Sequence, residues 1–174
     1  MSGDYFTERG MRHLGVAREF ADELHQLIGR ITVLEDFTLT EIDVLGTYMP
    51  VYEAAPATPL IVEGEYGDFM LLLLSGSVDV SRRDSHGKPS RIAVVQAGHT
   101  LGEMSMIDGE PRFSSCTTLE PTRFAVLTRD NLTEVIRAQS GVGAKILVKL
   151  VHMLAQRLRN TSMKLVKVSE QDLA

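Results

Sequence analysis

Residues 98–115 read GHTLGEMSMIDGEPRFSS, and they separate two segments that have the pattern of β-strands. Gly102 allows the backbone to turn closely, and residues 103–107 can form a single helical turn whose free amides attract an anion. Arg112 follows, and its planar guanidinium can grip a phosphate through two parallel hydrogen bonds. Glu103 would repel a phosphate and is better suited to accept a hydrogen bond from a hydroxyl, as on a ribose. Arginine and amides for phosphate, with glutamate for sugar, predict a nucleotide pocket.

Short strand-like segments lie on both sides of this stretch. One of them is wholly apolar, as a strand covered on both faces would be. Turn-forming residues recur between the segments, about every 8–12 residues. Roughly seven such segments favour an antiparallel sandwich or barrel. The clearest lie at residues 60–62, 69–74, 78–80, 92–95, 113–118 and 123–127.

Helical patterns precede this region. From Ala17 to Leu34, apolar residues recur at steps of three and four, which predicts one amphipathic helix. A second, shorter helix is expected at residues 40–45, with Thr40 as its N-terminal cap and Gly46 as its end.

A long helix is predicted for the end of the chain, after a short one at residues 130–138. Its apolar residues alternate steps of three and four for more than three heptads, which is the a/d seam of a coiled coil. Part of this helix is expected to cover the strands, and the heptads that continue past Asn160 predict a dimer interface. The seam residues are Ala144, Leu147, Val151, Leu154, Leu158, Thr161, Leu165 and Val168.

The composition is that of one soluble, cytoplasmic domain. The 174 residues are 44% hydrophobic and carry a formal net charge of −5, which gives no broad cationic surface for nucleic acid. No apolar stretch approaches the length of about 20 residues that a membrane helix needs, and the N-terminus has no secretory pattern. The single cysteine, Cys116, suits a reducing compartment and a packing role, and the five histidines lack metal-ligand spacing. We therefore expect no metal site and no enzyme.

Two motifs resemble the cyclic-nucleotide-binding domain family, which includes the catabolite activator protein, protein kinase A regulatory subunits and cyclic-nucleotide-gated channels. Residues 101–107 read LGEMSMI and residues 111–115 read PRFSS, similar to the two parts of the family's phosphate-binding cassette. Upstream, residues 63–76 read EGEYGDFMLLLLSG, similar to a glycine-rich strand motif of the family. The resemblance covers roughly residues 40–160 and rests on two motifs at the right separation.

The resemblance implies an α+β fold in three parts. An antiparallel, eight-stranded, jelly-roll-like β-roll would occupy residues 47–128 and carry the cassette at residues 101–115. N-terminal helices would occupy residues 1–46. The family's B helix and long C helix, which serves as a lid and here as the expected dimer seam, would occupy residues 129–174.

The resemblance also implies roles for cassette residues. Arg112 would bind the cyclic phosphate, Glu103 would bind the ribose 2′-hydroxyl, and backbone amides would complete the phosphate cradle. Phe113 stands where a threonine of the family helps to select cyclic GMP, so we expect cyclic AMP as the ligand, and no cofactor. The ligand-binding residues implied are Gly102, Glu103, Met104, Ser105, Arg112, Phe113 and Ser114.

Together these observations predict a cyclic-nucleotide sensor that forms a homodimer and signals to an unknown effector protein by moving its C helix. The chain ends at Ala174 without the winged helix-turn-helix of the catabolite activator class, so neither DNA nor a membrane is expected as a partner. An alternative stays open. Arg112 would then only pair with Glu103 or Glu110, and the degenerate domain would be a dimerisation or protein-interaction scaffold.

Overall fold

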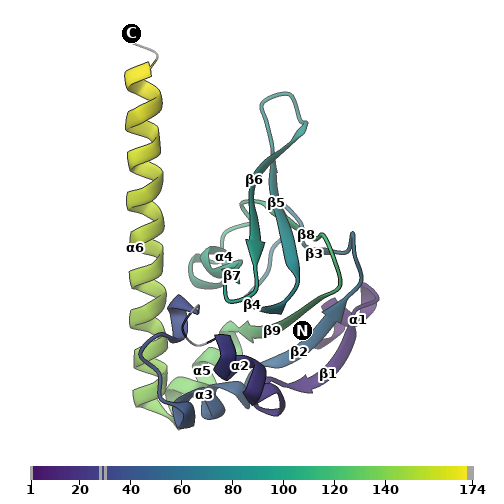
Figure 1. The fold of residues 1–174 in the computed structure, drawn as a ribbon, viewed down its shortest axis with the longest axis vertical. Coiled ribbons are helices and arrows are strands. Elements are labelled where there is room, and N and C mark those ends of the chain that lie inside the picture. Colours follow the sequence, from purple (N-terminus) through teal and green to yellow (C-terminus); the bar gives the residue numbers. More distant parts are fainter. Residues whose placement is uncertain (1, 28, 30, 172–174) are drawn as a thin grey trace.

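Two antiparallel β-sheets form the centre of the molecule in the computed structural model, which describes residues 2–27, 29 and 31–171 (Figure 1). One sheet has the strand order β1-β2-β9-β4-β7 and the other the order β3-β8-β5-β6. This is the α+β β-roll that the sequence predicts. The described strands are β1 (Arg12–Val16), β2 (Pro50–Ala54), β3 (Pro59–Ile61), β4 (Phe69–Ser75), β5 (Ser77–Arg83), β6 (Pro89–Gln96), β7 (Thr100–Leu101), β8 (Ser115–Thr118) and β9 (Thr122–Thr128).

Strand β4 belongs to two hydrophobic cores at once. Its residues alternate between an inner core, which lies between the two sheets, and an outer core, which lies between the five-stranded sheet and the helices. Every apolar side chain of the strand is therefore buried, as its unbroken apolar sequence predicts. Phe69, Leu71 and Leu73 belong to the inner core, and Met70, Leu72 and Leu74 belong to the outer core.

Helices surround the β-roll. One cap differs from the expectation, because Thr38 rather than Thr40 begins α3. The side chain of Thr38 accepts from the amide of Glu41, and the Glu41 carboxylate accepts from the amide of Thr38 in return. The helices are α1 (Ser2–Glu8), α2 (Ala21–Leu27), α3 (Leu39–Gly46), α4 (Glu103–Asp108), α5 (Arg129–Ala138) and α6 (Ser140–Gln171), with 3₁₀ turns η1 (Ala17–Phe20) and η2 (Thr32–Leu34).

The N-terminal region departs from the helical pattern that its sequence predicts. The apolar stripe from Ala17 to Leu34 is divided among η1, α2 and η2, and Gly29, a poor helix former, follows α2. The apolar side chains still share one environment, since those of the stripe pack in or against the outer core. Ahead of the stripe, β1 pairs with β2 and adds a strand to the expected eight. Burial of the stripe therefore did not require one continuous helix.

Helix α6 runs along one side of the β-roll and continues past it (Figure 1). Its first half packs on the outer core through Val142, Ile146, Leu150 and Met153. Residues 156–169 are all exposed. No described helix is long and apolar enough to cross a membrane.

Candidate functional site

The segment between β7 and β8 is a short helix held between two left-handed glycines. Gly102 has φ 81° and precedes α4, and Gly109 has φ 78° and follows it. A Cβ atom on Gly102 would lie 2.6 Å from Nη1 of Arg112 and 2.9 Å from Cδ1 of Ile61. Gly102 is therefore required twice, for its backbone conformation and for the close approach of the arginine. The first amides of α4 have no carbonyl within the helix to bond, as at any helix start.

Arg112 is a buried cation fixed by backbone carbonyls. Its side chain donates from Nη1 to the Gly102 carbonyl at 2.7 Å and from Nη2 to the Phe69 carbonyl at 2.8 Å. The guanidinium also lies over the Phe69 ring, 4.3 Å from its centroid, and the residue is only 4% exposed. Burial lowers the pKa of Arg112, but an arginine keeps its charge in proteins. A guanidinium carries five N–H groups, so the two carbonyls leave donors for an anion.

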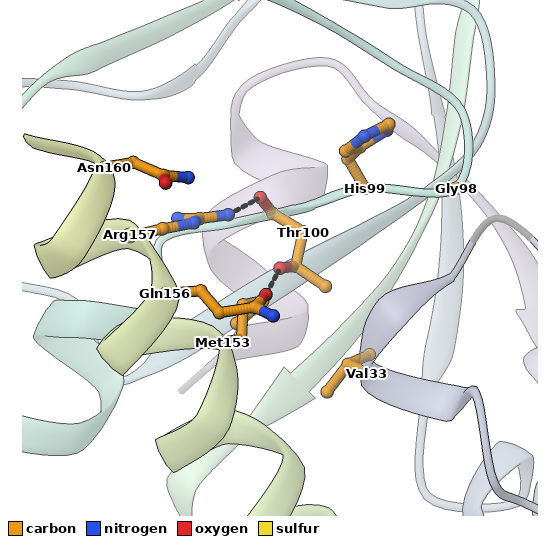
Figure 2. Close-up of a pocket in the computed structure, with 8 residues that line it drawn as sticks. All are labelled: Val33, Gly98, His99, Thr100, Met153, Gln156, Arg157 and Asn160. Carbon is orange, nitrogen blue, oxygen red and sulfur yellow. Dashed lines mark hydrogen bonds between the residues drawn. The ribbon is translucent and has the colours of Figure 1, made fainter.

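Glu103 is the buried acid beside this cation. The residue is 1% exposed, and its Oε1 accepts from the Thr100 hydroxyl at 3.0 Å. The same oxygen pairs with Nη1 of Arg157 at 2.6 Å. Arg157 also donates from Nη2 to the Thr100 carbonyl at 3.2 Å (Figure 2). Arg157 of α6 thus contacts both Glu103 and Thr100, which are also hydrogen-bonded to each other.

All seven sequence-predicted ligand residues line one cavity of about 390 Å³. This volume is within the range of small-molecule sites, about 300–1,000 Å³. Its apolar wall comes from the roll, with Ile61, Val80, Leu101 and Cys116 among its members. Burial raises the pKa of the Cys116 thiol to about 12, so this thiol is protonated near neutral pH and contributes to packing rather than to nucleophilic chemistry.

Phe113 lies at the margin of this cavity. The residue is 51% exposed, and its ring is covered by the Arg82 guanidinium at 3.9 Å from the centroid. Ser114, its neighbour, also lines the cavity. The aromatic ring therefore belongs to the rim of the cavity, with Arg82 over it.

Four residues of α6 complete the cavity and were not among the predicted ligand-binding residues. They follow the same steps of three and four as the buried residues Ile146, Leu150 and Met153, but they are polar. A helix face that changes from apolar to polar partway along its length was the available signal, because it marks where the helix leaves the core. These residues are Arg157, Asn160, Thr161 and Lys164.

A second, smaller pocket of about 160 Å³ is also lined by Arg157 (Figure 2). Val33, His99 and Gln156 contribute to its lining, and Arg157 and Asn160 line both pockets. Two further lining residues contact each other, since the Thr100 hydroxyl lies 3.2 Å from the Met153 sulfur. Within the described part of the chain, no group of three or more His, Cys, Asp or Glu side chains is arranged to hold a metal ion.

Residues 53–139 match the model of the cyclic nucleotide-binding domain family. A crystal structure of a cyclic nucleotide-binding domain from Methylobacillus flagellatus is 37% identical, has a TM-score of 0.80, and is matched over 90% of this chain and 88% of its own. The catabolite activator protein of Thermus thermophilus is 25% identical with a TM-score of 0.73, over 79% of this chain and 63% of its own.

Among curated proteins, a CRP-like cAMP-activated global transcriptional regulator of Mycobacterium tuberculosis is 26% identical over 139 residues. The match covers 80% of this chain and 60% of the regulator. The chain thus spans about three fifths of the length of the curated relative.

Proposed function

Because the chain belongs to the cyclic nucleotide-binding domain family, we propose that it is a non-catalytic, cytoplasmic sensor of cyclic AMP. In this proposal the cavity beside α4 binds the nucleotide, and α6 carries the signal to an effector protein. One observation supports it above all others. A buried arginine with free donors and a buried glutamate line the same cavity, next to the open amides of α4.

The cyclic phosphate would bind to Arg112 and to the amides at the start of α4. The guanidinium is already oriented by the carbonyls of Gly102 and Phe69, so a phosphate would meet a cation that needs little reorganisation. The ribose hydroxyl would donate to Glu103, which accepts hydrogen bonds when ionised. Phosphate and sugar are thereby recognised by groups of opposite charge that lie close together.

The purine would extend toward the rim and α6. Phe113 has a ring that lies under the Arg82 guanidinium and no hydroxyl for the amino group of guanine, which favours adenine over guanine. Thr161 and Lys164 line the same cavity from α6 and would lie near the base or the sugar. The Mycobacterium tuberculosis relative named above is described as a cAMP-activated regulator, which supports cyclic AMP.

Binding would reach α6 through Glu103. The ribose hydroxyl needs the same carboxylate that now pairs with Arg157, so ligand and helix compete for it or share it in a new arrangement. Ligand would then favour one position of the second half of α6 by its difference in affinity between the two states. Residues 156–169 are exposed and have little packing to resist such a movement.

The exposed face of α6 would bind a second copy of the chain. Its seam residues Val151, Leu158 and Leu165 are 67%, 69% and 70% exposed, and they repeat every seven positions. An apolar stripe of this period is typical of a coiled coil, and leaving it in water is unfavourable. A parallel dimer through this helix would bury the stripe and place two cavities symmetrically.

The alternative, a scaffold that binds no nucleotide, has a specific observation in its favour. Arg112 and Glu103 both have protein partners without any ligand, so neither group needs one to be stable. Calorimetric titration of the purified protein with cyclic AMP, cyclic GMP and cyclic di-GMP separates the two functions. A sensor binds cyclic AMP most tightly, whereas a scaffold releases no heat with any of the three at millimolar concentration.

A further inference from the structure

Helix α1 contacts the base of the cassette through two aromatic rings. The Phe6 side chain is fully buried in the inner core, with its ring centroid 4.9 Å from that of Phe69. The adjacent Tyr5 ring lies 5.2 Å from the same phenylalanine. Phe69 thus packs against α1 and also contacts Arg112 in the ligand site.

Phe69 in turn holds the head group of Arg112. The guanidinium lies over its ring at 4.3 Å, and the Phe69 carbonyl accepts from Nη2 at 2.8 Å. Displacement of Phe69 as a whole would move both the ring that contacts the guanidinium and the carbonyl that accepts from it. A change in α1 is therefore two contacts away from the cation.

A second path leads from α1 and the turn that follows it to the backbone of Arg112. Arg9 donates to both carboxylate oxygens of Glu65, at 3.1 Å and 3.0 Å, and the Tyr5 hydroxyl donates to the same carboxylate at 3.3 Å. The Arg9 guanidinium also lies 3.7 Å over the Tyr5 ring. The Glu65 carbonyl accepts from the amide of Arg112 at 2.8 Å, and the amide of Gly64 donates to the Arg112 carbonyl at 2.9 Å. The turn that contains Glu65 is thus hydrogen-bonded to both the amide and the carbonyl of Arg112.

We propose that Tyr5 of α1 and Arg9 of the turn that follows it are positioning residues for Arg112, and that this N-terminal segment thereby sets the affinity of the cavity for its anionic ligand. The ligand's identity rests on the proposed function; the positioning itself does not. Orientation of a binding group before the ligand arrives raises affinity because less freedom is lost on binding. Loosening either path lets the guanidinium sample other positions and lowers the affinity for the phosphate.

Hydrogen exchange of the unliganded protein tests the positioning directly. The Arg9→Ala and Tyr5→Leu variants should lower the protection of the Arg112 amide about threefold to tenfold, whereas the Val126 amide, in the centre of β9, should change little. The matched control is Arg12→Ala, which removes a neighbouring N-terminal ion pair, to Glu53, and leaves the contacts of Tyr5 and Arg9 with Glu65 in place. Arg9→Lys, which keeps the charge beside Glu65, should restore most of the protection.

Titration with cyclic AMP tests the consequence. We expect the dissociation constant to rise about threefold to fivefold in Arg9→Ala, as for loss of a largely exposed ion pair, and about tenfold in Tyr5→Leu, which also loses the ring contact. Unchanged protection at Arg112, or an equal loss at Arg112 and Val126, overturns the proposal, since the latter means only lower global stability. Unchanged affinity despite lost protection overturns its second half. If the wild type binds neither cyclic AMP nor cyclic GMP, the proposed function fails, while the exchange data still decide the positioning.

Discussion

The two walls of the cavity differ in how they are held. The cassette wall consists of groups that are almost fully buried and multiply hydrogen-bonded, with Arg112 4% and Glu103 1% exposed. The α6 wall consists of polar side chains on a helix segment that is exposed throughout residues 156–169. The side chain of Arg157 joins the two, through its pair with Glu103 and its hydrogen bond to the adjacent Thr100 carbonyl. A rigid wall suits recognition and a loosely held wall suits response, so the division of labour can be tested by altering each separately.

The largest effect is expected on dimerisation, from substitutions on the outer face of the α6 wall. The double variant Leu158→Ala and Leu165→Ala removes four leucines from a dimer; at roughly 1–2 kcal/mol for each burial lost, the dimer dissociation constant should rise at least about a thousandfold. The monomer should keep its stability, because both side chains are already exposed. Sedimentation equilibrium measures the change. Met163→Ala, exposed but off the seam, is the control, and a wild type that stays at 19.2 kDa at high concentration excludes the dimer.

The next effect concerns the cassette wall. Arg112→Leu removes the countercharge of the phosphate, and because each charge-assisted bond is worth about 1.5–3 kcal/mol, a bidentate pair should cost more than about a hundredfold in cyclic AMP affinity. Arg112→Lys should also bind weakly, since an ammonium cannot make the same planar pair. Calorimetry measures both.

The control for this variant is Arg123→Leu, which removes a partly buried arginine of β9 that pairs with Glu23 away from the cavity. The Arg112→Leu protein should remain folded by circular dichroism, since it loses two bonds to carbonyls and little of the core. Wild-type affinity in the Arg112→Leu variant would end the assignment of the cassette.

Removing the contact between the two walls should have a moderate effect, and on the stability of the unliganded protein. Arg157→Gln leaves the buried Glu103 without its cation, so the unliganded protein should lose about 1–3 kcal/mol of unfolding free energy. A ribose hydroxyl would compensate part of this loss, so saturating cyclic AMP should raise the melting temperature more in the variant than in the wild type. Thermal scans with and without ligand measure the difference. An equal shift in both proteins would show that ligand and Arg157 do not share Glu103.

The smallest effect is expected at the rim. Wild type should bind cyclic AMP at least about tenfold more tightly than cyclic GMP, a difference of about 1.4 kcal/mol. Phe113→Thr should narrow that ratio by offering a hydroxyl to the guanine amino group, while Phe113→Val, of similar size to threonine, should not. Competition titrations give the ratio. A wild type that already prefers cyclic GMP would contradict the role given to Phe113.

The cassette wall was accessible from the sequence in a way that the α6 wall was not. Gly102, Glu103 and Arg112 belong to one short segment whose glycines, turn and charges encode their own local geometry, and the structure brings all the predicted residues to one cavity. For Thr161, by contrast, the sequence pattern predicts only a place in the seam. Its contact with the cavity depends on how the helix packs against the roll. Whether these residues bind nucleotide stays a prediction.

The N-terminal region was predicted least well, for a related reason. The apolar stripe from Ala17 to Leu34 indicated burial, but the residues it packs against decide whether it forms one helix or several pieces. The contacts of Tyr5 and Arg9 with Glu65 join positions that are far apart in the chain, and local periodicity contains no information about such pairs.

Strand β4 joins the two hydrophobic cores into one cooperative unit. Its alternating side chains are shared by the core between the sheets and the core beneath the helices, so neither core can open without exposing apolar surface of the other. Its backbone amides should therefore exchange only through global unfolding and report the full free energy of the protein. Heating or denaturant should consequently melt the β-roll and the packed half of α6 in one transition, with the exposed half of the helix fraying independently and earlier.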